Sequence, residues 1–208
     1  MSEELDVEEL RSELETIKDA MGIRERYPSQ FRLWLVYGVL VGLAALGSQA
    51  VVLYDLPGWG HWVAWGGLMG LGGVYQWVGI DREMGAGGSS DAKPNVGVHY
   101  LAAFGYAFAV LAAVSPLFDG AEAAVLSSTV FAVVVGAVGL AYVLVGNALK
   151  AYYIRRRDRL AFYLGGAWML GLAAVIPNVP ALRRWGYAVF GIAFALHAVG
   201  SYIALARA

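Results

Sequence analysis

Six long apolar stretches that carry almost no charge are the feature that most constrains the fold of this chain. Each has about 18–26 residues, enough to cross a hydrocarbon core of about 30 Å as a helix rising 1.5 Å per residue. Because lipid offers the backbone no hydrogen bonds, we expect helices that pair their own peptide groups. The predicted spans are residues 33–54, 61–80, 97–117, 123–148, 160–177 and 185–206.

The charged residues are few and gather outside these stretches. Only 15% of the 208 residues are charged, whereas a soluble domain has about a quarter. The net charge of −1 argues against a nucleic-acid partner. The chain has no cysteine, which excludes disulfides and thiolate metal sites. All six prolines lie at or beyond span ends, so continuous helices are expected, and the first 26 residues lack the apolar core of a cleavable signal peptide.

The positions of the basic residues predict the orientation. Basic residues precede the first span and occur between the second and third, and a cluster at 150–159 lies between the fourth and fifth. The loops at 55–60 and 118–122 have none, and only Arg183 and Arg184 oppose the pattern. Since cytoplasmic loops are richer in Lys and Arg, we expect a multi-pass protein of the cell membrane with both termini cytoplasmic. The excess of arginine over lysine is typical of a GC-rich prokaryotic genome.

The short loops predict that the spans pair as three antiparallel hairpins. The fold class expected is therefore an all-α integral membrane protein. Six transmembrane helices (residues 27–208) follow a short cytoplasmic coiled-coil helix (residues 1–26).

The N-terminal segment has the spacing of a heptad seam. Its apolar residues recur every three and four positions, and charges of opposite sign fall where a parallel partner helix would meet them. A parallel homo-oligomer is the favoured interpretation, and packing of one amphipathic helix on the protein's own cytoplasmic face is the alternative. The seam is Val7, Leu10, Leu14, Ile17 and Met21, with the charge pairs Asp6–Arg11 and Glu13–Lys18.

Small residues are dense in the spans and predict close helix packing. Gly38 and Gly42 form one GxxxG pair, and Gly66 and Gly70 form another. Such pairs let two helix backbones approach closely in lipid, either inside one bundle or between subunits.

Aromatic residues near the span ends predict anchoring at the membrane surface. Trp34, Trp77 and Tyr187 are among them. Amphipathic rings prefer the level of the lipid headgroups, so we expect these side chains at the two interfaces.

Polar side chains within the spans are the candidate functional residues. His197 is the ionisable side chain nearest the middle of a span, and such a group is either a structural hydrogen-bonding residue or a functional one. Gln49 is expected nearer the outside, and Gln76 and Asn147 nearer the inside. The predicted intramembrane polar site is therefore His197 with Gln76, Asn147 and Gln49.

One enzyme family gives a partial resemblance. Ser128 near the outer end of the fourth span, and His197 followed by Gly200 in the sixth, resemble the serine–histidine dyad of the rhomboid intramembrane proteases. The resemblance implies a six-span protease, but the family's G-x-S-G is replaced by Leu-Ser-Ser-Thr at 126–129. Without those glycines an oxyanion site is not expected, and we predict no enzyme activity.

No cofactor is predicted either. His61 and His99 fall near opposite membrane faces and away from the depth of His197, which does not fit two axial haem ligands. The function expected is a non-enzymatic, self-associating scaffold, sensor or accessory subunit that meets the lipid bilayer and a cytoplasmic protein. The alternative is a passive channel or small-molecule transporter formed by the bundle or its oligomer.

Overall fold

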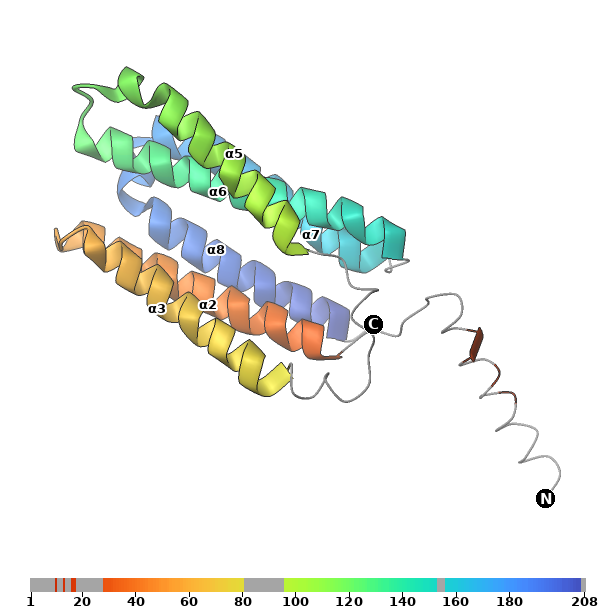
Figure 1. Ribbon diagram of the computed structural model, residues 1–208. Helices are drawn as coiled ribbons and strands as arrows, with labels where there is room; N and C mark the ends of the chain where they lie inside the picture. The colour runs from red at the N-terminus through yellow and green to blue at the C-terminus, as the bar shows by residue number, and fades with distance from the viewer. Residues whose placement is uncertain are drawn as a thin grey trace.

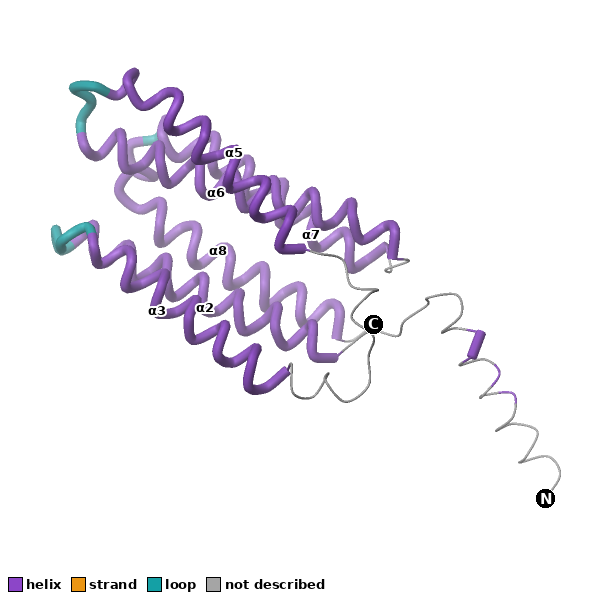
Figure 2. The backbone as a smooth tube through the Cα atoms, viewed as in Figure 1, coloured by secondary structure: helices purple, strands orange, loops and turns teal. Residues whose placement is uncertain are grey.

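The structure is a bundle of long helices (Figure 1). It is a computed structural model that describes residues 10, 13, 16–17, 28–80, 96–152 and 156–206. Every regular element in these ranges is helical, and short loops join the helices at one end (Figure 2). The long helices are α2 (Pro28–Leu53), α3 (Trp59–Tyr75), α5 (Val96–Val114), α6 (Ala123–Ala148), α7 (Arg156–Val175) and α8 (Pro180–Ala206).

Short turns of other helix types extend four of these helices. A π-helical turn, η1 (Gln76–Ile80), continues α3, and 3-10 turns continue the other three. Proline explains two of the 3-10 turns, because Pro116 and Pro177 cannot donate the backbone hydrogen bond that an α-helix needs. The 3-10 turns are η3 (Ser115–Phe118) after α5, η4 (Leu149–Tyr152) after α6 and η5 (Ile176–Asn178) after α7.

The predicted all-helical fold is confirmed, with five to six helices long and apolar enough to cross a membrane. Five helices are both long enough and apolar enough over at least 20 residues each, whereas α3 has 17 α-helical residues before η1 lengthens it. The described helices begin and end within a few residues of the predicted spans, except that α2, α7 and α8 start about five residues early. The five stretches are Trp34–Leu53, Val98–Phe118, Ala124–Ala148, Arg156–Asn178 and Pro180–Ala204.

The helices form two layers of three. One layer holds α2, α3 and α8, and the other holds α5, α6 and α7 (Figure 1). Within the first layer α2 packs along both α3 and α8, and within the second α6 packs along both α5 and α7. The pairs α2–α3 and α5–α6 are neighbours in sequence, as in the first two predicted hairpins. The third predicted hairpin differs, because α7 packs mainly on α6 and α8 mainly on α2.

Small residues explain why α8 packs on α2. A Cβ added at Gly38 would collide with Ala198, and one added at Gly191 would lie 2.8 Å from the Gly42 carbonyl oxygen. These two helix backbones therefore approach as closely as a GxxxG pair permits. A Cβ added at Gly66 or Gly70, by contrast, would meet nothing within 4 Å beyond its chain neighbours and the backbone of its own helix. The first GxxxG pair thus serves packing inside the chain.

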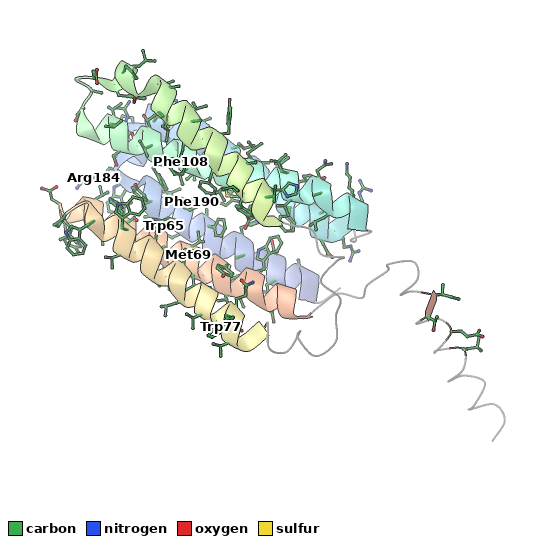
Figure 3. The ribbon with its side chains drawn as sticks, in the orientation of Figure 1. Trp65, Met69, Trp77, Phe108, Arg184 and Phe190 are labelled. Carbon is green, nitrogen blue, oxygen red and sulfur yellow. The ribbon has the colours of Figure 1, made fainter. Side chains whose placement is uncertain are left out.

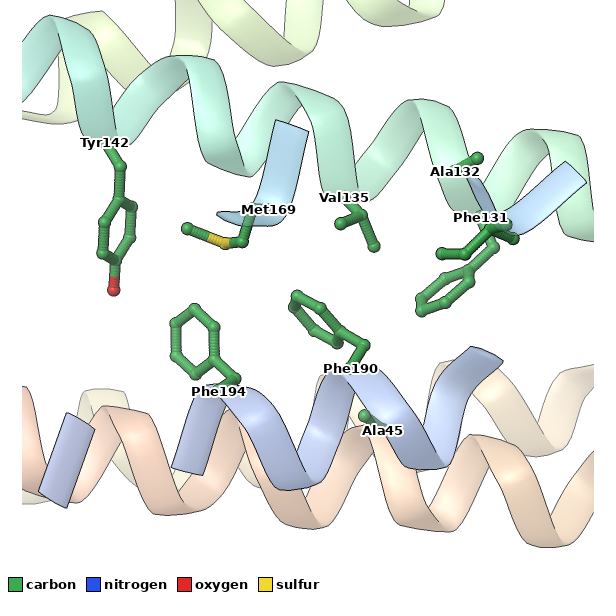
Figure 4. Packing of buried hydrophobic residues seen from close by; sticks show 9 residues of the cluster. Ala45, Phe131, Ala132, Val135, Tyr142, Met169, Phe190 and Phe194 are labelled. Carbon is green, nitrogen blue, oxygen red and sulfur yellow. The ribbon is translucent and has the colours of Figure 1, made fainter. Parts of the chain in front are cut away.

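The buried core lies between the two layers. Phe190 and Phe194 project from α8 towards residues of α6 and α7, among them Val135, Tyr142 and Met169 (Figure 4). Phe190 and Met169 are buried almost completely. Apolar side chains from both layers therefore fill the seam that joins them.

Candidate functional site

The four predicted polar residues lie in four different surroundings. Gln49 is buried between α2 and α8, and Gln76 lies at the end of α3. Asn147 is on an exposed position of α6, whereas His197 lies in the seam between the layers. The structure does not bring these side chains together into one site.

Gln49 ties α2 to α8 through two hydrogen bonds. Its Nε2 donates to the Arg184 carbonyl at 2.8 Å, and its Oε1 accepts from the Ala188 backbone N–H at 3.0 Å. In an α-helix those two backbone groups are four residues apart and face each other. The Gln49 amide therefore bonds to a carbonyl and an N–H group that lie one turn apart on α8. This role is structural.

Two further polar contacts tie α2 to α3. The Trp65 indole N–H donates to the Ser48 hydroxyl at 3.0 Å, and Ser48 is fully buried. The Tyr37 hydroxyl donates to Gln76 Oε1 at 3.1 Å, where α3 changes to the π-helical turn. Polar residues read from the sequence as possible functional groups thus act in helix–helix contacts.

The serine and histidine of the protease resemblance are far apart. The Ser128 hydroxyl donates to the Val125 carbonyl of its own helix at 3.0 Å. His197 lies beside Tyr142, with ring centroids 6.4 Å apart. Because Tyr142 follows Ser128 by 14 residues on α6, their separation along the helix is about 21 Å. The two side chains form no dyad in this structure.

A continuous row of aromatic rings runs along the seam. At the start of α3, His61 stacks on Tyr187 at 5.4 Å, and Tyr187 lies 3.8 Å from Phe131. Phe190 follows at 5.8 Å from Phe131, and Phe194 at 5.4 Å from Phe190. Phe190 lies between the layers, on the face of α8 that meets α6 (Figure 3).

The row ends in a cluster of rings around His197, which we call the His197 cluster. The centroid of the imidazole lies 6.4 Å from Trp34, 6.4 Å from Tyr142 and 6.2 Å from Trp168. Trp34 also packs edge-on against Phe162 at 4.4 Å. The rings come from α2, α6, α7 and α8. The His197 cluster comprises Trp34, Tyr142, Phe162, Trp168, Phe194 and His197.

Three buried nitrogen atoms of this cluster have no hydrogen-bond partner among the described residues. They are Nε1 of Trp34, Nε1 of Trp168 and Nε2 of His197. The imidazole interacts with the backbone of Ala161, but its Nε2 has no partner of hydrogen-bond geometry. A buried donor or acceptor without a partner costs about 1–3 kcal/mol, so three such atoms in one cluster require an explanation.

Gly165 on α7 makes this arrangement possible. A Cβ added there would lie 2.7 Å from Nε2 of His197 and 2.8 Å from the Tyr142 ring. Only a residue without a side chain lets α7 approach the two rings so closely.

Sequence reasoning missed the His197 cluster as a unit. Trp34 and Tyr187, which were predicted as anchors at the membrane surface, both pack against the buried core. The available signal was the spacing of Phe190, Phe194 and His197, which puts three rings on one face of a helix.

The predicted N-terminal seam falls largely outside the described residues. Within it, Leu10, Glu13 and Ile17 are described, and all three are helical and exposed. The remaining predicted oligomerisation residues, Val7, Leu14, Met21, Asp6, Arg11 and Lys18, lie outside the described ranges.

Among the described residues no group of three or more His, Asp or Glu side chains is placed to hold a metal ion. Comparison of the chain with protein-family models, with curated proteins and with solved structures found no match.

Proposed function

We propose that this chain crosses the cell membrane six times, with both termini in the cytoplasm, and acts as a self-associating scaffold, sensor or accessory subunit. The observation that carries the proposal is how its polar side chains are used. Ser48, Gln49 and Gln76 join helices to one another, and the Ser128 hydroxyl bonds to its own helix. Side chains used in this way hold a bundle together and leave little for chemistry.

Two exposed apolar residues of the N-terminal segment support self-association. Leu10 and Ile17 occupy the same heptad position of the predicted seam and are 57% and 56% exposed. Apolar residues of a seam that do not pack on the protein's own bundle are available to a second copy. The helices of the bundle tether the segment, which raises its effective concentration.

The seam between the two helix layers is filled with side chains, which favours this function over a passive channel. A water-filled pathway through one bundle needs polar groups along its length. The row from His61 to His197 instead places aromatic rings there. Liposomes that hold the protein are expected to show no flux of ions, water or small neutral solutes, and reproducible flux would favour the channel.

The predicted oligomer is tested by placing charged side chains in the N-terminal heptad seam. Leu10→Asp with Ile17→Asp should lower the mass of the full-length protein measured by light scattering in detergent, because buried carboxylates destabilise a coiled coil. The matched control adds the same two charges at outward positions, with Ser12→Asp and Thr16→Asp, and should leave the mass unchanged. A monomeric parent protein, or equal masses for both variants, would contradict self-association through this segment.

Orientation is tested separately with single cysteines in the natural cysteine-free chain. A cysteine at Ser2 or Ala208 should resist an impermeant maleimide in intact cells, whereas one at Gly58 or Gly120 should react. Labelling at both termini would overturn the orientation.

A further inference from the structure

Four basic side chains gather where the end of α6 meets the start of α7. Lys150 lies on η4 directly after α6, and the first turn of α7 carries three arginines. A Cβ added at Gly146 of α6 would lie 3.0 Å from the Cβ of Phe162 of α7, so these two helix ends lie side by side (Figure 1). We call this group the α6–α7 basic cluster, and its members are Lys150, Arg156, Arg157 and Arg159.

The positive charge of this cluster is only partly offset within its own turn of helix. Asp158 is the acidic residue of that turn, and it is buried. Four positive charges and one negative charge leave a net charge of +3. Lys150, Arg156 and Arg157 are exposed, and the Nε atom of Arg159 is buried without a hydrogen-bond partner among the described residues. An anion outside the protein is therefore the electrostatic complement of the cluster.

The dipole of α7 makes this arrangement unfavourable unless an anion is bound. The N-terminus of an α-helix carries a partial positive charge, which favours acidic side chains in the first turn and disfavours basic ones. The first turn of α7 has the reverse composition, Arg-Arg-Asp-Arg at 156–159. An anion beside this turn is attracted both by the arginines and by the backbone N–H groups of the helix end.

The cluster lies at the depth of the lipid headgroups in the membrane-spanning arrangement proposed above. The helical stretch Arg156–Asn178 has 23 residues, which at 1.5 Å per residue gives a length of about 35 Å. That length exceeds a hydrocarbon core of about 30 Å but is less than the roughly 40–45 Å of a bilayer with its headgroups. The first turn of α7 is therefore expected among the headgroups, where the anions at hand are lipid phosphates.

We propose that the α6–α7 basic cluster binds the phosphate headgroup of an anionic lipid in the cytoplasmic leaflet. A guanidinium group pairs with phosphate through two parallel N–H···O bonds, and arginine holds three of the four positions. Four or more Lys and Arg residues directly beside a membrane span are typical of proteins that bind such lipids. The proposal rests on the membrane-spanning arrangement and orientation proposed above, and it does not depend on self-association.

The first experiment compares two lipids with the same acyl chains. Phosphatidylglycerol is anionic, whereas in phosphatidylcholine a choline cation cancels the phosphate charge. Full-length protein in mixed micelles receives equal amounts of both, and native mass spectrometry counts the lipids that stay bound. Phosphatidylglycerol should be retained in excess. Inorganic phosphate should not displace it, because the acyl chains of a lipid add apolar contacts with the helices.

Two results of this experiment would contradict the proposal. Equal retention of both lipids would overturn it and leave an acidic protein segment as the partner of the cluster. Displacement of phosphatidylglycerol by inorganic phosphate would overturn the choice of a lipid and assign the cluster to the free ion.

Two pairs of neighbouring arginines then locate the site. Arg156→Gln with Arg157→Gln should weaken phosphatidylglycerol binding about thirtyfold, from the usual contribution of a basic residue beside anionic lipid. The matched control is Arg183→Gln with Arg184→Gln, because these arginines are also exposed near the start of a helix, α8, at the opposite end of the bundle. The control should bind like the parent protein, and equal losses for both pairs would refute the assignment.

Thermal unfolding in phosphatidylcholine alone shows whether each variant folds. If the Arg156 and Arg157 double variant does not, Lys150→Gln carries the test, with binding weakened about fivefold. The outcome is separable from that of the proposed function. A monomeric protein that prefers phosphatidylglycerol would contradict self-association alone, whereas an oligomer without that preference would contradict only the lipid site.

Discussion

The contact of Gln49 with α8 predicts a measurable loss of stability when its amide is removed. Gln49→Leu keeps a side chain of similar size but deletes the bonds to the Arg184 carbonyl (2.8 Å) and the Ala188 N–H (3.0 Å). Each such bond contributes about 0.5–1.5 kcal/mol net, so the expected loss is about 1–3 kcal/mol. Values measured inside membrane proteins average about 0.6 kcal/mol per bond, which places the result near the lower end of that range.

The assay is reversible unfolding of the purified protein in mixed micelles of increasing denaturing detergent. Thr129→Val is the matched control, because it also replaces a polar side chain by an apolar one of similar size. The bond it deletes, from Thr129 to the Val125 carbonyl at 2.8 Å, lies within one helix. The control should change the free energy of unfolding by less than about 0.5 kcal/mol, as expected for a local bond. If Gln49→Leu unfolds at the same detergent fraction as the parent, or if both variants lose equally, the contact does not hold α2 to α8.

Two further predictions concern the packing of α2. Gly38→Val should destabilise the bundle strongly, because a side chain there collides with α8, whereas Gly66→Val should be tolerated, since no neighbouring helix lies within 4 Å. The thermal unfolding midpoints of the two variants measure this difference. An equal loss for both variants would refute the prediction. Ser48→Ala should cost about 1 kcal/mol by leaving the Trp65 indole N–H, bonded at 3.0 Å, without its acceptor. The same detergent unfolding measures it, and an unchanged midpoint would show that the indole finds another acceptor.

The long apolar helices were predictable because length and apolarity reflect one physical requirement, the shielding of backbone groups. The short loops likewise predicted that α2 packs on α3 and α5 on α6. The choice of α2 as the main neighbour of α8 was not predictable, because it depends on small residues from distant parts of the sequence, with Gly42 meeting Gly191 and Gly38 meeting Ala198. Small residues predict that a close helix–helix contact exists, but they do not indicate which helix is the partner.

The His197 cluster could not be predicted from the sequence for a related reason. Position along a span predicts the depth of a residue in the membrane, and on that basis Trp34 belongs near the surface. Which way a side chain faces depends on the neighbouring helices. Trp34 faces Phe162 across the seam and lies beside His197 of its own layer. The same limit applies to Gln49. Its place near the end of the first predicted span could be read from the sequence, whereas its bond to Arg184 depends on which helix faces it.

The pairing of the first long helix with the last has a consequence for biosynthesis. Gly38 and Ala198 lie 160 residues apart in the sequence, yet they form one of the tightest contacts in the bundle. At about 5–20 residues per second, a ribosome needs roughly ten to thirty seconds to make the chain between them. During that interval the glycine face of α2 has no α8 helix of its own chain to pack against. The α8 helix of an older, neighbouring copy has the right shape to occupy it, so crowded synthesis favours exchange of this helix between molecules.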